Sequence, residues 1–264
     1  FFMALKPDPS EPRRLIGNNT SEVVTLSIAD ATNFPLGIWM LGGDDQVTGS
    51  TANDLVYGND GEDIIRGDLV SDSLFGGINN DFLGGDQGND FLSAGQDADW
   101  LTGGAGDDVL LGGRGNDALF SGNGNDTLVG GLGREFLAAL DDNNTSLKIG
   151  GSNLYVLQAE PGVTDFNNAD VIVFFRPGVD RIGLAGGLTA SDLDLQYVTN
   201  VTVLLGFEAP EVFKQLLPPG VLNVPPVQSQ GTLMKVRNSG DIVGFVAQTR
   251  VADVQSSIIP VQDF

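Results

Sequence analysis

Apolar residues recur every nine positions through the middle of the chain. Ten consecutive nine-residue units run without interruption from Gly49 to Ala138, and a partial unit, MLGGDDQVT, precedes them from Met40. Each unit opens with a glycine-rich stretch and carries an apolar residue at its eighth place. An unbroken repeat of this kind predicts a solenoid of stacked short strands. The eighth-place residues are Val47, Val56, Ile65, Leu74, Leu83, Leu92, Leu101, Leu110, Leu119, Leu128 and Leu137.

The seventh and ninth places predict a second apolar surface. Side chains alternate between the two faces of a strand, so the eighth place faces inward and its neighbours face outward. Of the twenty outward places from Leu55 to Ala138, twelve are large and apolar. Exposed apolar surface of this extent marks a contact surface, so both sheets need a cover. The twelve are Leu55, Tyr57, Ile64, Phe75, Phe82, Phe91, Trp100, Val109, Leu111, Phe120, Val129 and Phe136.

Two sources of cover remain open. Residues 1–45 and 150–264 could fold back over the sheets, or other copies of the chain could cover them and build a filament or layer. Solenoid ends also need caps. The segment SEVVTLSIADATNF, from Ser21, is expected to form a strand before the first coil. The segment GTLMKVRNSGDIVGFVAQTR, from Gly231, predicts a hairpin that caps the roll or covers a sheet.

These features divide the chain into three parts. Residues 1–39 form an N-terminal extension or cap strand, residues 40–156 the repeat region, and residues 157–264 a β-rich capping or assembly region. Within the last part, EVFKQLL is expected to form a helical turn or two, and LPPGVLNVPP a proline-rich connector.

Charge narrows the choice of partner. The chain has 35 acidic and 13 basic residues, a net charge of −22, and 41% hydrophobic residues. The chain is too apolar for ordinary disorder, and its acidic charge is large enough for self-repulsion to oppose folding without a partner. Such a charge would repel nucleic acid and anionic membranes, whereas a hard cation bound by oxygen ligands would relieve it. The expected partner is a cation.

The residues that the chain lacks exclude most catalytic chemistry. It contains no cysteine and no histidine. Disulfides, thiolate metal sites, Ser-His-Asp and Cys-His catalysis and HExxH proteolysis are therefore excluded, and we expect no enzyme activity. The first residues, FFMALKPDPSEPRR, contain no apolar stretch long enough for a signal peptide or membrane span, so we expect a mature or trimmed product.

Aspartate at the sixth place is the acidic group that the repeat supplies. Glycine at the first, second and fourth places allows positive φ and lets backbone carbonyls close around an ion. The sixth-place residues are Asp45, Asp54, Asp63, Asp72, Asp81, Asp90, Asp99, Asp108, Asp117 and Asp126.

Units such as GGAGDDVLL and GGRGNDALF resemble the calcium-binding nonapeptide GGxGxDxUx of the RTX (repeats-in-toxin) proteins. The resemblance implies an all-β parallel β-roll, a right-handed β-solenoid, in which two units make one coil. The first six residues of a unit form a turn, the last three form a strand, and several calcium ions bridge stacked turns. The aspartates then form one ladder of Asp45, Asp63, Asp81, Asp99 and Asp117 and a second of Asp54, Asp72, Asp90, Asp108 and Asp126.

Folding and calcium binding are expected to be one equilibrium, because closely stacked carboxylates repel unless a divalent ion lies between them. Because of departures from the motif, calcium binding by the turns at both ends of the stack stays an open question. Ala52, Val70 and Asp97 stand at the fourth place, and Glu135 replaces the last aspartate. Beyond it, Asn144 and Asn153 hold the places of lost aspartates.

A later segment, from Asp170 to Leu184, resembles DxIxDFxxGxDxIxL, a pattern that often follows RTX repeats in cyanobacterial secreted proteins. The resemblance makes Asp180 a further candidate calcium ligand, whereas Phe174 stands where the pattern has aspartate.

The resemblance also implies function. It indicates a calcium-binding protein that is secreted by the one-step (type I) route to the medium or cell surface. Because the roll leaves no room for a catalytic site without histidine, we expect a structural or adhesive role. Assembly into filaments or layers through the apolar outer faces is one of the two open sources of cover. The alternative is the RTX domain of a larger secreted enzyme or toxin whose catalytic part is absent from this chain.

Overall fold

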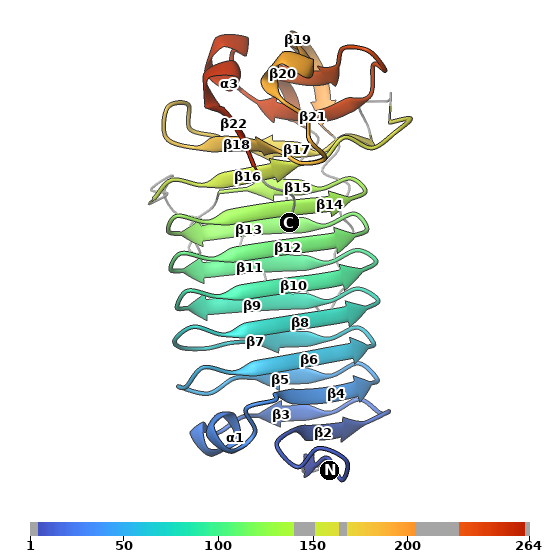
Figure 1. The fold of residues 1–264 in the computed structure, drawn as a ribbon, viewed down its shortest axis with the longest axis vertical. Helices are drawn as coiled ribbons and strands as arrows, with labels where there is room; N and C mark the ends of the chain where they lie inside the picture. Colours follow the sequence, from blue (N-terminus) through green and yellow to red (C-terminus); the bar gives the residue numbers. More distant parts are fainter. Residues whose placement is uncertain (1–4, 140–150, 164–167, 204–226, 262–264) are drawn as a thin grey trace.

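The protein is an elongated stack of short strands (Figure 1). The computed structural model describes residues 5–139, 151–163, 168–203 and 227–261. Two eleven-stranded sheets, which we call sheet A and sheet B, run along the stack. Sheet A contains, in order, β1 (Lys6–Pro7), β2 (Leu15–Asn18), β4 (Ile38–Gly42), β6 (Leu55–Asp60), β8 (Ser73–Ile78), β10 (Phe91–Gln96), β12 (Val109–Arg114), β14 (Thr127–Leu132), β16 (Leu154–Leu157), β18 (Arg181–Leu184) and β22 (Ile258–Pro260).

Sheet B faces it and combines parallel coil strands with an antiparallel end. Its order is β19 (Leu193–Val203), β20 (Val227–Val236), β21 (Ile242–Ala247), β17 (Val171–Val173), β15 (Phe136–Ala138), β13 (Ala118–Asn123), β11 (Trp100–Ala105), β9 (Phe82–Gln87), β7 (Ile64–Arg66), β5 (Gln46–Thr48) and β3 (Val23–Thr25).

Neighbouring strands in the repeat region are parallel and 18 residues apart. Leu92 pairs with Leu74 and Leu110 in sheet A, and Leu101 pairs with Leu83 and Leu119 in sheet B. Two nine-residue units therefore make one coil, one strand for each sheet. This arrangement confirms the predicted all-β parallel β-roll.

The core lies between the sheets and consists of the eighth-place residues. All eleven are at most 1% exposed and belong to one continuous cluster. Full burial of a Val, Leu or Ile side chain contributes about 1.5–3 kcal/mol relative to exposure. The predicted core is thus confirmed along its whole length.

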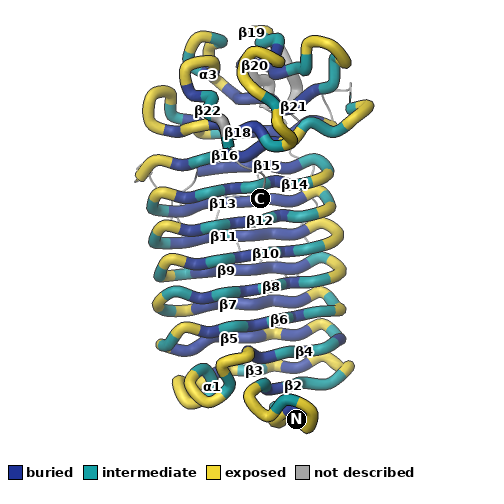
Figure 2. The backbone as a smooth tube through the Cα atoms, viewed as in Figure 1, coloured by how far each residue is buried: buried dark blue, intermediate teal, exposed yellow. Residues whose placement is uncertain are grey.

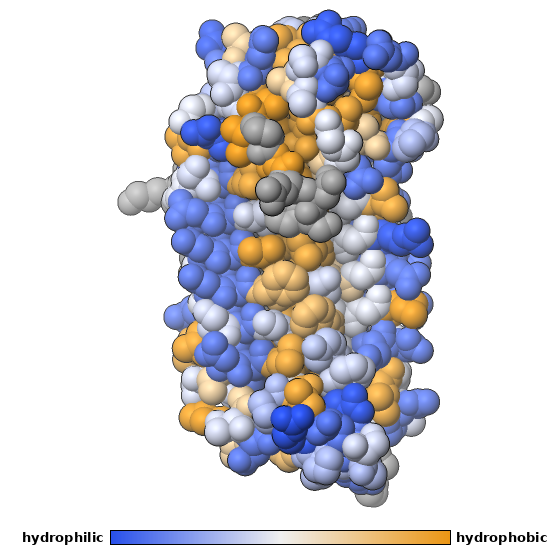
Figure 3. Space-filling model, in the orientation of Figure 1, coloured by the Kyte–Doolittle hydropathy of each residue, from blue (hydrophilic) through white to orange (hydrophobic). Residues whose placement is uncertain are grey.

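The outward places differ between the two sheets. On sheet B, Ile64, Phe82, Trp100, Phe120 and Phe136 are buried. On sheet A the outward places are half-buried, which gives the alternating pattern of its strands in Figure 2. Apolar side chains gather in a column along the face in Figure 3, between hydrophilic margins.

The described terminal segments mainly lengthen the roll. Strand β2 pairs with β4 and β3 with β5, while β16, β17, β18, β21 and β22 continue the two sheets past the repeats. The stacked architecture therefore extends on both sides of residues 40–156.

The segment from Ser21 is only partly a strand, which corrects the sequence expectation. Val23–Thr25 forms β3, but Ile28–Asn33 forms helix α1. Ser27 and Asp30 make a reciprocal capping box at its start, in which each side chain accepts from the other residue's backbone N–H. These local bonds favour a helix start over strand continuation.

The predicted hairpin is present. Strands β20 and β21 pair antiparallel on either side of Asn238–Gly240, and helix α3 (Val251–Ser257) packs against β18, β19 and β20. The short 3-10 helix η2 (Ala190–Asp192) precedes β19. EVFKQLL, LPPGVLNVPP and Asn144 lie outside the described residues. Among the described helices, none has the length and apolarity needed to cross a membrane.

Candidate metal centre

The sixth-place aspartates lie inside the turns that connect the two sheets. All ten are at most 3% exposed, although each carries an ionisable carboxyl group. The turns close tightly because of their glycines. Gly106, for example, has φ of 140°, and a Cβ added there would lie 1.6 Å from the carbonyl oxygen of Gly88 in the preceding coil. No larger residue fits such a turn without displacing backbone.

Hydrogen bonds join these aspartates into the two predicted ladders. In each ladder the backbone N–H of one aspartate donates to Oδ1 of the aspartate 18 residues later, at 2.7–3.0 Å. Ladder 1 contains Asp45, Asp63, Asp81, Asp99 and Asp117, and ladder 2 contains Asp54, Asp72, Asp90, Asp108 and Asp126. One oxygen of each acceptor carboxylate is thereby committed to holding adjacent coils together.

The second carboxylate oxygen has no donor in nine of the ten turns. Oδ2 of every ladder aspartate except Asp54 is buried without a hydrogen-bond partner. Buried polar oxygens are normally bonded, so nine orphans at the same place in successive turns require a common explanation. At Asp54 the backbone N–H of Ser50 donates to Oδ2 instead.

Backbone carbonyls converge on the same positions. A Cβ added at Gly85 would lie 2.3 Å from Oδ2 of Asp90 and 2.5 Å from the carbonyl oxygen of Gly103 in the next coil. Five other first-place glycines each face an equivalent pair, namely Oδ2 of the aspartate in their own turn and a carbonyl oxygen of the next coil. They are Gly58, Gly67, Gly76, Gly103 and Gly112. Each such turn therefore offers one carboxylate oxygen and at least one carbonyl oxygen in a small buried space.

Burial without a cation shifts the titration of these carboxyl groups strongly. It raises the pKa of Asp81 to about 9 and the pKa values of Asp72 and Asp99 to about 8. The backbone N–H bonds oppose this shift, and neighbouring carboxylates add to it. The same burial raises the pKa of every other ladder aspartate. A bound cation would reverse this effect, because it favours the ionised form.

The donor set fits calcium. Calcium takes six to eight oxygen ligands, from carboxylates, carbonyls and water, in flexible geometry. Among the described residues no group of three or more acidic side chains could hold a metal ion by itself. The ladder aspartates would therefore hold calcium together with the turn carbonyls, and the ion would balance the negative charge of the buried carboxylates.

Both ladders continue past the predicted aspartates. The backbone N–H of Glu22 donates to Asp45, and that of Glu135 donates to Asp170, so ladder 1 gains acidic residues at both ends. The unit GGLGREFLA pointed to Glu135. Nothing in the sequence spacing pointed to Glu22 or Asp170, because 23 and 35 residues separate these partners.

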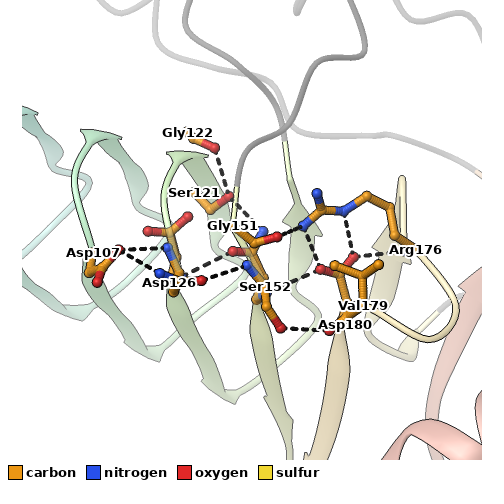
Figure 4. Close-up of polar contacts among 11 residues, drawn as sticks. Asp107, Ser121, Gly122, Asp126, Gly151, Ser152, Arg176, Val179 and Asp180 are labelled. Atoms are coloured by element: carbon orange, nitrogen blue, oxygen red, sulfur yellow. Dashed lines mark hydrogen bonds and ion pairs between the residues drawn. The ribbon is translucent and has the colours of Figure 1, made fainter.

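Ladder 2 ends differently. Asp126 N–H donates to Asn153, and Asn153 N–H donates to Asp180, in steps of 27 residues. Asn153 thus takes the place of an aspartate, as expected from the sequence. Asp180 is fully buried, but the Arg176 guanidinium bonds its carboxylate (Figure 4).

Fold and site together define a class of protein, namely a parallel β-roll whose glycine-rich turns present buried carboxylates to a hard cation. Residues 41–74, 71–92, 84–119 and 93–128 match four copies of the RTX calcium-binding nonapeptide repeat. The chain is an RTX repeat protein over this region. Such repeats bind calcium, and the proteins that carry them are generally secreted. A comparison with curated proteins finds no significant match.

Proposed function

We propose that this chain is a secreted, non-enzymatic calcium-binding protein of the bacterial cell surface or extracellular matrix. Its work is structural or adhesive, and calcium converts it from a flexible acidic chain into a stiff roll. The observation that supports this proposal is the row of nine buried Oδ2 atoms without donors, six of which lie close to a backbone carbonyl oxygen of the next coil.

The proposed mechanism couples folding to the calcium concentration. Stacking the coils without calcium buries carboxylates whose ionisation opposes burial, so the calcium-free chain remains largely unfolded near neutral pH. A ligand that binds only the folded state stabilises it in proportion to the logarithm of its concentration. Extracellular calcium modules have dissociation constants of about 10⁻⁴–10⁻³ M, a range suited to folding outside the cell.

The ten ladder aspartates are the proposed ligands, with Oδ2 as the coordinating atom where it has no other partner. Asp54 is the weakest of them because Ser50 already donates to its Oδ2. Asp180 belongs to the same ladder but already carries the Arg176 charge at its carboxylate.

The outward face of sheet A supports assembly as part of this role. Its aromatic side chains form a continuous row, with ring centroids 4.6 Å apart for Trp39 and Tyr57, 4.7 Å for Tyr57 and Phe75, and 5.7 Å for Phe75 and Phe91. The row is only half-buried. A flat, partly exposed apolar row of this length suits contact between copies in a filament or layer. Small-angle scattering of the calcium-loaded protein tests this, and a monodisperse monomer at high concentration would contradict it.

Calcium titration followed by far-ultraviolet circular dichroism and size-exclusion chromatography tests the central proposal. The wild-type chain is expected to gain β signal and become compact as calcium rises. Asp63→Asn should shift the midpoint to higher calcium, because it removes a buried ligand charge. Asp60→Asn is the matched control, since Asp60 lies in the same turn but is exposed, and should leave the midpoint unchanged.

A wild-type chain that folds equally well in chelator would refute the calcium role. Equal midpoints for the two variants would refute the assignment of the sixth-place ligand. An upstream catalytic domain in the full reading frame would instead favour the RTX domain of a larger secreted enzyme or toxin.

A further inference from the structure

The last turn of ladder 2 is built like a calcium turn but contains an arginine. The stretch Phe175–Gly183 reads as a nonapeptide unit, with Gly178 at the fourth place, Asp180 at the sixth and Ile182 at the eighth. Ile182 is fully buried and pairs with Tyr155, which pairs with Leu128. The inward row of the repeats therefore continues in register, and Asp180 occupies the ladder place. Arg176 stands at the second place, where the motif has glycine.

Hydrogen bonds from Arg176 close this turn (Figure 4). Its Nη2 donates to Oδ1 of Asp180 at 2.7 Å, its Nε donates to Oδ2 at 3.1 Å, and its backbone N–H donates to Oδ2 at 2.7 Å. Both carboxylate oxygens therefore have charged or backbone donors. This differs from the ladder aspartates with an orphan Oδ2.

The guanidinium also reaches the preceding coil. Nη2 donates to the carbonyl oxygen of Gly151 at 2.9 Å. Gly151 holds the fourth place of the Asn153 turn and stacks on Gly124, because a Cβ added at Gly151 would lie 1.7 Å from the Gly124 carbonyl oxygen. One positive group thus bridges a carbonyl of one turn and the carboxylate of the next, which is the bridging role expected of calcium in the other turns.

We infer that the guanidinium of Arg176 takes the cation position of this turn, so that ladder 2 ends in a built-in cation and Asp180 binds no calcium. The inference rests on the proposed function, in which calcium bridges the other turns. It replaces the expectation from the motif that Asp180 is a further calcium ligand.

The charges at this end support a protein-supplied cation. Asn153 is neutral, and the single charges of Asp180 and Arg176 cancel, so the last two turns require no external ion. A buried carboxylate is stable only when it is paired and well bonded, and the planar guanidinium fork meets both oxygens at once. Asn153 also binds Ser121 Oγ through its Nδ2, at 3.3 Å. The end of ladder 2 is therefore satisfied by hydrogen bonds within the chain.

Counting bound calcium in the full chain tests the inference. The count is taken by equilibrium dialysis against calcium and elemental analysis. Asp180→Asn should bind the same number of ions as the wild type, whereas Asp108→Asn, at a ladder place with an orphan oxygen, should bind one fewer or bind calcium several-fold more weakly. A loss of one ion in Asp180→Asn would overturn the inference, whatever its effect on folding.

A second variant tests the same point in the opposite direction. Arg176→Gly restores the motif glycine and frees the Asp180 carboxylate, so it should bind one more calcium ion than the wild type. Arg181→Gln is the matched control, because Arg181 is an exposed arginine in the next strand, and should keep the wild-type count. An unchanged count in Arg176→Gly, together with the loss of one ion in Asp180→Asn, would place calcium at Asp180 in the wild type and refute the inference. A wild type without any bound calcium would instead refute the proposed function.

Discussion

The repeat region and the C-terminal end use the same stacked architecture but neutralise buried charge differently. In the repeats, every coil adds two buried aliphatic core residues and two buried carboxylates. Of the ten ladder carboxylates, nine have an oxygen without a hydrogen-bond partner. In the C-terminal end, larger core residues such as Tyr155 and Phe245 join an antiparallel hairpin and helix α3. Its last ladder carboxylate is bonded by Arg176.

The difference follows from repetition. A nine-residue unit whose turn has glycine at three places has little room for a long cationic side chain, and each coil contacts only its neighbours. An external divalent ion can serve every turn equally. At the C-terminal end of ladder 2 only one turn needs a charge, the repeat is interrupted, and an arginine four residues before the aspartate can supply it.

Removing calcium should separate the two regions most clearly. With excess chelator near neutral pH, strands β6 to β14 are expected to lose nearly all hydrogen-exchange protection, because ionised ladder carboxylates cannot remain buried. Strands β16 and β18 should keep more protection, since Asn153, Arg176 and Asp180 satisfy one another. Hydrogen exchange with mass spectrometry measures this by segment. Uniform protection or uniform loss along the chain would contradict a difference in charge neutralisation between the two regions.

Lowering the pH should partly replace calcium. The ladder carboxyl groups have pKa values raised from an unfolded value near 3.8, to about 9 at Asp81, so the calcium-free folded state binds more protons than the unfolded state. Its stability is therefore greatest at low pH and falls as pH rises through the raised values. Calcium-free protein should show more β signal by circular dichroism at pH 5 than at pH 8. The opposite trend would contradict the burial of these groups.

Truncating a core side chain should lower the free energy of unfolding by similar amounts in both regions, but it should change the calcium requirement for folding only in the repeats. Leu101→Ala and Ile182→Ala each remove a fully buried eighth-place side chain, and each is expected to lower the free energy of unfolding by about 2–5 kcal/mol in saturating calcium. Only Leu101→Ala should also raise the calcium concentration needed for folding of β6 to β14. Leu132→Ala, at an exposed position, serves as the control and should change stability by about 0.5 kcal/mol or less.

The smallest effect is expected for a surface ion pair within the repeats. Arg66 and Asp86 lie 3.4 Å apart with side chains 30% and 39% exposed. Asp86→Asn should lower the free energy of unfolding by less than about 1 kcal/mol, since exposed pairs gain little from their attraction. Urea unfolding in saturating calcium measures it. A larger loss would show that cations on the repeat surface help to neutralise the stack.

The sequence predicted the repeats better than the ends, for physical reasons. A nine-residue period fixes the register and the core, so the inward leucines followed from the spacing, whereas the two aspartate ladders followed from the RTX resemblance, in which two units make one coil. Helix α1 was missed because alternation after Val23 resembles a strand, while the Ser27–Asp30 capping box favours a helix. Asp170 was not placed in ladder 1, because the 35-residue step from Glu135 breaks the period. The role of Arg176 depended on geometry that no motif contains.

The chain of N–H to Oδ1 bonds also gives the roll a direction. Nine of the ten ladder aspartates donate to the residue one coil later, so such a turn acquires its acceptor only when the following coil is in place. Completed turns can therefore propagate from the C-terminal end toward the N-terminus, each coil serving as the template for the one before it. Because Arg176 completes the last turn of ladder 2 without calcium, folding can start at that turn. Calcium binding then adds the preceding coils one at a time.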